Sequence, residues 1–199
     1  MEDIRSIHDY WFGSNPDDAV AAAEQAKIWW TKNPVIDAQM RARFRVYVEA
    51  AGRGELGDWA AIPLGRLALI LLTDQFPRNI YRDTAQAFAF DPFALRYCRE
   101  GIALGADRML RPIERVFCYL PLEHSESLND QHESVRLFSR LLEDVVPEHK
   151  LKFQGYLHFA IRHRDIIERF GRFPHRNRVL GRVSTAEEAA FLETPGSTF

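Results

Sequence analysis

Residues 63–76 read PLGRLALILLTDQF, and this stretch decides the fold. Pro63 suits the first turn of a helix, and apolar side chains then occupy nearly every side of that helix. A helix that is apolar all round must be surrounded by protein, so we expect it at the centre of the molecule. The stretch ends at Phe76, and Pro77 follows it. Because proline cannot continue a helix, we expect the helix to end at Phe76.

The rest of the chain shows helical spacing in segment after segment, with almost no alternating strand pattern. Asn15–Pro16 and Asn33–Pro34 are typical of a helix start, and Ser184 with Glu187 has the spacing of a capping box. We therefore predict an all-α protein with a single domain of roughly nine helices over residues 1–199, with residues 194–199 as a loose tail. Further helices are expected at residues 92–105, 112–120, 127–146 and 149–170.

Composition excludes several classes of partner. The 199 residues carry a net charge of −2 with a pI near 6.4, so there is no global attraction to nucleic acid or to anionic membranes. The longest apolar run, residues 67–72, is too short to cross a membrane, and the acidic N-terminal segment is not a secretory signal. A cytoplasmic location is therefore expected. Cys98 and Cys118 lack the paired spacing of metal or redox motifs, so we expect two buried free thiols.

Two similar polar turns stand out, FPRN at residues 76–79 and RFPHRN at residues 172–177. Each follows an apolar helix and places an arginine beside an asparagine. The arginine fork suits the oxygens of a carboxylate or a phosphate. We expect both turns to meet in one polar centre. The ligand-binding residues predicted from the turns are Arg78, Asn79, Arg172, His175, Arg176 and Asn177.

Polar residues also interrupt apolar helix faces. His163 falls in the middle of the apolar stripe of helix 149–170, and Gln131 falls on the same face as Leu128 and Val146. Asp74 lies near the end of the central helix. Because buried polar groups are nearly always paired, each needs a partner, and an arginine is the expected partner of Asp74. Asp74 and Gln131 join the predicted ligand-binding set, whereas His163 is either a hydrogen-bonded core residue or a catalyst.

The segment YLPLEHSESL, residues 119–128, places His124 and Glu126 on a proline-containing turn before a helix. These residues could perform acid–base chemistry, with Glu126 orienting His124. They could bind a metal if His163 and His175 converged on them, or the segment could simply cap the helix. Since His-x-Glu alone lacks the spacing of zinc motifs, we predict no metal and no cofactor. His124, Glu126 and His163 are the predicted catalytic residues.

Several long motifs resemble a family of mainly bacterial proteins catalogued as a domain of unknown function. The resemblance covers nearly the whole chain and is carried by the segments YWFG (10–13), DQFPRN (74–79), YLPLEHSE (119–126), HRDIIERFGRFPHRN (163–177) and LGRVSTAEE (180–188). It implies an all-helical superhelix similar to tetratricopeptide-repeat proteins. The recurring polar residues of the family fall on all of the predicted site positions. The resemblance implies no activity, because a fold does not fix a function.

Three functions fit these observations. The first is a pocket for a small anionic ligand, a carboxylate or a phosphate, in which His124 or His163 moves protons and affinity rises as the pH falls through 6–7. The second is a tetratricopeptide-like module that binds an acidic peptide or a protein partner. The third is a buried polar network that locks helix ends together without any chemistry. Nucleic acid and membrane are not expected partners, and the sequence does not indicate an oligomeric state.

Overall fold

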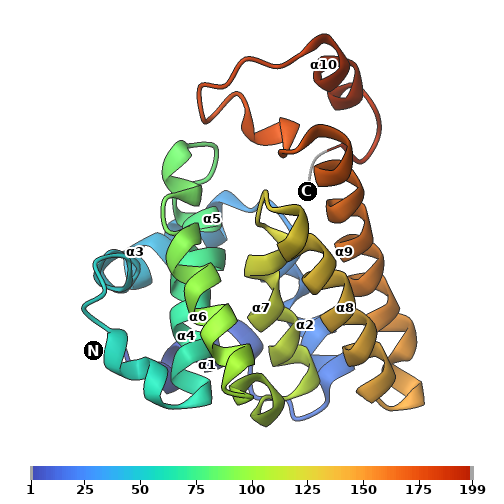
Figure 1. Ribbon diagram of the computed structural model, residues 1–199. Coiled ribbons are helices and arrows are strands. Elements are labelled where there is room, and N and C mark those ends of the chain that lie inside the picture. The colour runs from blue at the N-terminus through green and yellow to red at the C-terminus, as the bar shows by residue number, and fades with distance from the viewer. Residues whose placement is uncertain (1, 198–199) are drawn as a thin grey trace.

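Every regular element in the described residues, 2–197 of the computed structural model, is a helix (Figure 1). The described part of the chain forms nine helices when the consecutive elements α4, η2 and α5 are counted as one, which confirms the predicted all-α, single-domain fold. The α-helices are α1 (Ile4–Phe12), α2 (Asp18–Trp30), α3 (Pro34–Gly52), α4 (Pro63–Ile70), α5 (Phe76–Ile80), α6 (Asp91–Ala103), α7 (Pro112–Glu123), α8 (Leu128–Asp144), α9 (Lys150–Phe170) and α10 (Ala186–Leu192). Short elements join them: η1 (Gly57–Ala61), η2 (Leu71–Gln75), η3 (Ala85–Phe88), η4 (Ala106–Met109), η5 (Pro147–His149) and η6 (Pro174–Arg176).

The central position expected for residues 67–72 is confirmed. All six side chains are at most 1% exposed, and α4 packs against α1, α6 and α7. Aromatic rings fill the space beside them, and the ring of Trp11 lies 5.4 Å from both Phe76 and Phe117. Burying such large apolar side chains is the main stabilising contribution to the fold.

The central helix does not end at Phe76, contrary to the sequence prediction. It widens into the π-helical turn η2 and continues through Pro77 to Ile80. Proline has no N–H to donate, and the wider turn accommodates it because the N–H of Phe76 bonds instead to the carbonyl of Leu71. The hydroxyl of Thr73 donates to the carbonyl of Leu69 at 2.6 Å. Asp74 therefore lies on an irregular turn inside a continuous helix.

Two predicted helix starts are displaced, and one is confirmed. Asn33 caps α3 as expected, and its side chain accepts from the N–H groups of Val35 and Ile36. The cap of α2 is Asp17, since Asn15 instead accepts from the N–H of Asp17. The capping box of α10 pairs Thr185 with Glu188, one residue later than expected. A neighbouring acid or threonine that could cap equally well explains both shifts.

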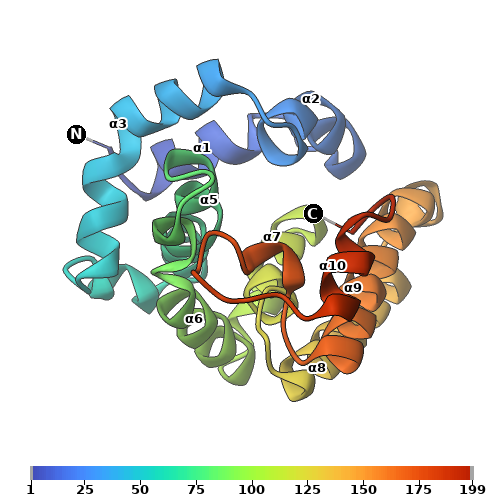
Figure 2. The ribbon, with the colours of Figure 1, turned by 90° about the horizontal axis from the view of Figure 1, so that it is seen from above.

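The C-terminal segment folds back over the helical body. α8 packs against both α7 and α9, and after α9 the segment 171–185 passes over α7 and reaches α6 (Figure 2). Ile166, Ile167 and Phe173 form a small apolar cluster of their own, together with Phe170 and Phe191. The tetratricopeptide-like superhelix implied by the resemblance stays a prediction.

The end of the predicted tail is partly ordered by contacts. The hydroxyl of Ser197 donates to the carbonyl of Leu192 at 3.0 Å, and Arg162 donates to the carbonyl of Gly196 at 2.6 Å. Residues 198 and 199 lie outside the described residues. Within residues 2–197, no helix combines the length and the apolar character needed to cross a membrane.

Candidate functional site

The two polar turns meet at Asp91, the first residue of α6. Arg78 donates to both carboxylate oxygens of Asp91 at 2.9 and 3.1 Å, and Nη1 of Arg176 lies 3.7 Å from Oδ2. Both guanidinium groups lie over the ring of Phe88, at 5.5 Å for Arg78 and 4.7 Å for Arg176. The predicted proximity of the two turns is therefore confirmed. Asp91 and Phe88, which the sequence did not indicate, are what bring the turns together.

A carboxylate–histidine pair forms the middle of this polar centre. Nδ1 of His124 lies 2.8 Å from Oδ1 of Asp74, and Nη1 of Arg78 lies 3.0 Å from the same oxygen. Gln75 donates to the other oxygen. Burial opposes ionisation of Asp74, but the charges of Arg78 and His124 and these hydrogen bonds together hold the pKa of Asp74 below its usual range. Asp74 is therefore a fully paired carboxylate, with the arginine partner that the sequence predicted.

His124 ends α7 and keeps one ring nitrogen accessible. Its side chain is 15% exposed, and Nε2 has no hydrogen-bond partner among residues 2–197. Burial, together with the positive charge of Arg78, lowers the pKa of His124 below its ordinary value. The ring is therefore neutral at pH 7. The lowered pKa argues against the hypothesis that protonation of this imidazole near pH 6–7 strengthens anion binding. A neutral histidine held by a carboxylate is suited to accept a proton.

A second acid–histidine pair, Glu123 with His163, lies beside the first. Nδ1 of His163 is 3.1 Å from Oε1 of Glu123 and 2.9 Å from the carbonyl of Phe159, and the His163 ring lies 6.2 Å from that of His124. Burial and the charge of Asp74 raise the pKa of Glu123 to about 8. Burial and the proximity of His124 keep the pKa of His163 well below its ordinary value. At neutral pH this pair therefore retains one proton and carries no net charge.

Glu123 is the residue that the sequence analysis missed here. It ends the unbroken buried run from Val116 to Glu123. The sequence signal for it is an acidic residue directly after the apolar letters YLPL, since a buried acid needs a partner. The prediction that helix 112–120 ends before Pro121 is wrong and explains the omission. α7 continues through Pro121 to Glu123, so Glu123 is buried inside a helix rather than displayed on a turn.

Arg176 is a buried cation with an incomplete set of partners. It is 7% exposed and lies between the rings of Phe88 and Phe173, at 4.7 and 4.5 Å. Its ion pair with Asp91 is long, at 3.7 Å, and Nε has no hydrogen-bond partner in the described part of the chain. Burial and the positive charge of Arg78 lower the pKa of Arg176 to about 10. Buried charged groups normally have close partners, so an added anion would stabilise this one.

Glu126 does not orient His124, contrary to the acid–base hypothesis, in which these two residues were paired. Its Oε1 accepts from the N–H of Phe173 at 2.8 Å, and Arg182 donates to both of its oxygens at 2.7 and 3.0 Å. Arg182 also donates to the carbonyl of Phe173 at 3.0 Å. Glu126 therefore ties the C-terminal segment to the body, and Asp74 takes the place beside the imidazole. The short sequence distance between His124 and Glu126 suggested the wrong pairing.

The remaining predicted site residues make contacts at the edge of the polar centre. Asn79 donates to Asp37 at 3.1 Å, and Gln131 donates to the carbonyls of Glu123 and Ser125, both at 2.7 Å, which secures the end of α7. Arg172 and Asn177 both donate to Glu188. Their observed hydrogen bonds therefore hold helix ends and the C-terminal segment.

His175 lies on the same turn as Arg176. Its ring lies 5.6 Å from that of Phe173, and burial and the charge of Arg176 lower its pKa to about 3. His175 is therefore uncharged at neutral pH, like His124 and His163. Within residues 2–197, no three His, Cys, Asp or Glu side chains gather in an arrangement that could hold a metal ion.

The two cysteines are buried free thiols, as predicted. Burial raises the pKa of Cys98 well above its ordinary value and that of Cys118 to about 12. Both thiols therefore stay protonated at neutral pH, and neither is a reactive nucleophile.

Comparison with known proteins identifies the family. The family described as "Bacterial protein of unknown function (DUF924)" matches residues 7–196, which include the whole polar centre. The chain belongs to the DUF924 family. A similar solved structure, that of the protein of unknown function ATU0120 from Agrobacterium tumefaciens, is 39% identical in sequence, with a TM-score of 0.81 over 96% of each chain. No curated protein matches the sequence. The DUF924 assignment confirms the resemblance seen in the motifs and gives no activity.

Proposed function

We propose that the polar centre binds a small anion, a carboxylate or a phosphate, at Arg176, and that His124 exchanges a proton with the bound molecule. The observation that carries this proposal is the state of Arg176. Its guanidinium group is buried between two aromatic rings, its ion pair is long, and its Nε lacks a partner in the described part of the chain. Arginine offers donors in a rigid fork that matches carboxylate and phosphate oxygens.

The charges of the polar centre favour one anion and not several. Asp74 and Asp91 balance Arg78 and Arg176, while the lowered pKa values of the three histidines and the raised pKa of Glu123 leave these groups neutral at pH 7. The anion therefore binds through local donors and not through a large excess of positive charge. Arg78 is already satisfied by two carboxylates, so Arg176 is the residue on which affinity depends.

His124 is placed to act on such a ligand. Asp74 holds Nδ1, which fixes the tautomer that leaves Nε2 able to accept a proton. The carboxylate would then stabilise the imidazolium that forms. The charge of Arg176 contributes to the lowered pKa of His124, so the two groups are within electrostatic reach of each other. This arrangement supports proton transfer to or from a group next to the anionic end of the ligand.

Calorimetric titration with phosphate, sulfate and acetate at pH 7.5 tests the proposal. Arg176→Gln removes the charge and should weaken binding by about tenfold or more, as expected for a lost charge-assisted hydrogen bond. Arg45→Gln, which removes an exposed arginine paired with Glu49 on α3, is the matched control and should bind normally. Binding that is equal in the Arg176 variant and the control would overturn the proposal.

His124→Asn separates binding from proton transfer. The asparagine amide can still donate to Asp74 near the position of Nδ1, but the side chain no longer titrates. We expect this variant to bind the anion and to lose the proton uptake or release that the wild type shows in buffers of different ionisation enthalpy. The same titration with an acidic peptide examines the alternative, a tetratricopeptide-like module, which would bind the peptide and not the small anions.

A further inference from the structure

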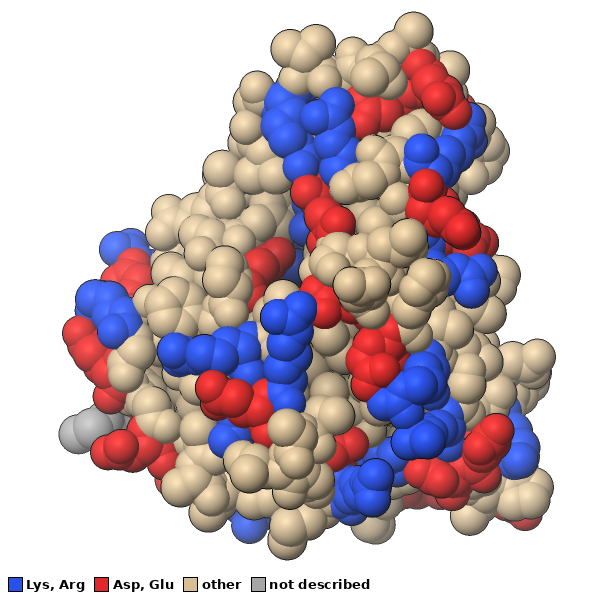
Figure 3. Space-filling model, viewed as in Figure 1, with Lys and Arg blue, Asp and Glu red and all other residues tan. Residues whose placement is uncertain are grey.

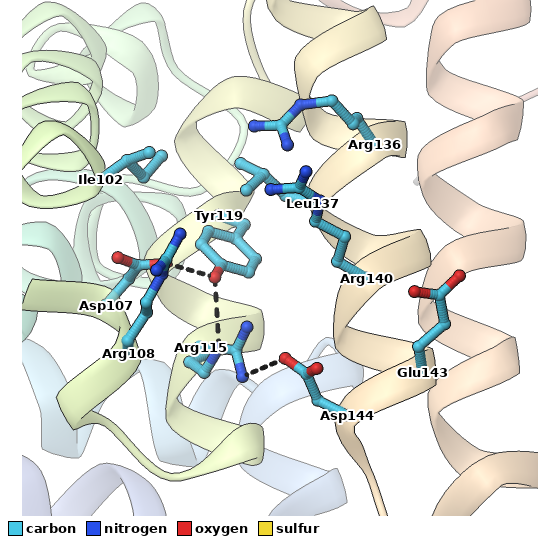
Figure 4. Close-up of a pocket in the computed structure, with 10 residues that line it drawn as sticks. All are labelled: Ile102, Asp107, Arg108, Arg115, Tyr119, Arg136, Leu137, Arg140, Glu143 and Asp144. Carbon is cyan, nitrogen blue, oxygen red and sulfur yellow. Dashed lines mark hydrogen bonds and ion pairs between the residues drawn. The ribbon is translucent and has the colours of Figure 1, made fainter. Parts of the chain in front are cut away.

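An arginine-rich pocket lies away from the polar centre, against the first half of α7. Its volume is about 510 Å³, within the usual range for small-molecule sites. η4, α7 and α8 supply its arginines, Arg108, Arg115, Arg136 and Arg140, and the ring of Tyr119 and the side chains of Ile102 and Leu137 line it between them (Figure 4). The polar centre is at the opposite end of α7, where His124 lies.

Two of the four arginines are already engaged. Arg115 donates to Asp144 at 2.9 Å and to the Tyr119 hydroxyl at 3.2 Å, and Arg136 pairs with Glu133 on the neighbouring helical turn. Arg115 is largely covered, with a side chain 13% exposed, so these contacts hold its guanidinium in a fixed place. The pocket therefore contains a preorganised donor as well as flexible ones.

The other two arginines, Arg108 and Arg140, have no hydrogen bond or ion pair to any described residue. Both are exposed, and both extend toward the space beside the Tyr119 ring (Figure 4). The acidic groups of the lining do not neutralise them. Asp107 accepts from the Tyr119 hydroxyl at 2.6 Å, and Glu143 points away from the guanidinium groups in Figure 4.

On this face of the molecule, basic side chains gather over α8 with acidic ones beside them (Figure 3). By contrast, most of the arginines described in the polar centre form an ion pair with a carboxylate. Arg108 and Arg140 thus bring two guanidinium groups without a close carboxylate to the same pocket. A pocket with unpaired arginines on two elements suits a ligand with several anionic oxygens.

From this geometry we infer that the pocket binds the phosphate or diphosphate group of a small-molecule ligand. Arg108 and Arg140 would approach the phosphate from opposite walls, and Arg115 would donate from the floor. A single carboxylate has two oxygens and would satisfy one arginine fork, whereas a phosphate or diphosphate has enough oxygens for all three. The tyrosine ring and Leu137 offer an apolar wall for the uncharged part of the ligand. This inference does not depend on the function proposed for the polar centre.

Calorimetric titration of the full chain with pyrophosphate, inorganic phosphate and acetate tests the inference. We expect pyrophosphate to bind more tightly than phosphate, and acetate, a single carboxylate, to bind weakest. The double variant Arg108→Gln/Arg140→Gln should weaken pyrophosphate binding by about tenfold or more. Arg45→Gln/Arg53→Gln is the matched control, because it removes two exposed arginines from α3 and its C-terminal end and lowers the net charge equally.

The outcomes distinguish the pocket from the polar centre. Arg176→Gln should leave pyrophosphate binding at the pocket unchanged, even if it abolishes anion binding at the polar centre. The inference would be overturned if Arg176→Gln lost pyrophosphate binding while the Arg108/Arg140 double variant kept it. It would also be overturned if the wild type did not bind pyrophosphate at all. Equal weakening in the control double variant would show attraction to net charge alone and would also overturn it.

Discussion

Replacing Glu123 by Gln should change how the stability of the protein depends on pH. Glu123 and His163 retain one proton between them in the folded protein, because the pKa of Glu123 is raised to about 8 and that of His163 is well below its ordinary value. In the unfolded chain, Glu123 loses its proton near pH 4.5 and His163 near pH 6.5. Between pH 6.5 and about 8 the folded state therefore binds one more proton than the unfolded state, and stability falls as the pH rises.

The sign and size follow from the two residues separately. The raised pKa of Glu123 contributes stability that is complete below pH 4.5 and lost by about pH 8. The lowered pKa of His163 contributes stability that is complete above pH 6.5 and is lost as the pH falls below 6.5, so Glu123 alone of the two sets the slope above pH 6.5. The free energy of unfolding therefore declines as the pH rises from 6.5 to about 8. At about 1.36 kcal/mol per pH unit, the decline amounts to about 2 kcal/mol.

Glu123→Gln removes this decline. The glutamine oxygen can still accept a hydrogen bond from His163, but the side chain binds no proton. Urea unfolding of the wild type and the variant across pH 6.5 to 9 should show the variant gaining about 2 kcal/mol relative to the wild type. The comparison cancels the titration of Cys98, Cys118 and the tyrosines, which both proteins share.

The control for this experiment is Glu24→Gln, an exposed residue in the middle of α2. Its free energy of unfolding should run parallel to that of the wild type at every pH. Parallel curves for the wild type and Glu123→Gln would refute the reasoning, because they would show that Glu123 is ionised in the folded protein at neutral pH.

Two further predictions concern the hydrogen bonds of the polar centre. Asp74→Ala and Gln131→Ala should each cost about 1–3 kcal/mol in urea melts because they leave buried partners unsatisfied, whereas exposed His158→Ala should cost less than about 0.5 kcal/mol. Equal losses for Asp74→Ala and His158→Ala would contradict the assignment of buried and solvent faces. Glu126→Gln should speed hydrogen exchange in residues 172–185 while leaving α7 and α8 unchanged, since it weakens the tie to Phe173 and Arg182. Unchanged exchange in residues 172–185 would show that this tie does not hold the segment.

Much of the fold could be predicted from the sequence because helical periodicity is a local signal. The apolar residues 67–72 indicated the central helix, and His163 was correctly placed on a buried face, at 5% exposed. Leu128 and Val146 were expected to be buried and are exposed, at 38% and 53%, because α8 starts and ends inside the predicted range of 127–146. Predictions of the capping residue failed for α2 and α10, where a neighbouring residue could cap the helix equally well.

Two proline residues lie where the sequence-based prediction of helix ends was wrong. Pro77 and Pro121 were expected to stop helices, yet both lie inside helices, with η2 just before Pro77. Local propensity disfavours proline within a helix, but tertiary packing of the buried segments around it outweighs that preference. Reading α7 as ending early hid Glu123, and with it the second acid–histidine pair.

The members of the polar centre were largely foreseen, but their pairing was not. The sequence identified Asp74, Arg78, His124, His163 and Arg176, which the fold brings together. Asp91 could not have been identified as the shared partner, because it lies 85 residues before Arg176 in the sequence. The pocket of Arg108 and Arg140 was missed for the same reason, since η4 and α8 are distant in sequence.

The imidazole resonances of His124 test the central claim most directly. In ¹H–¹⁵N spectra at pH 7.5, with His124 assigned by His124→Asn, the Nε2 signal should shift saturably when phosphate or acetate is added. The shift should be absent in Arg176→Gln and present in Arg45→Gln. A His124 signal that does not shift with either anion would contradict an anion site formed by Arg176 beside His124. A shift in Arg176→Gln as large as in the wild type would contradict it as well.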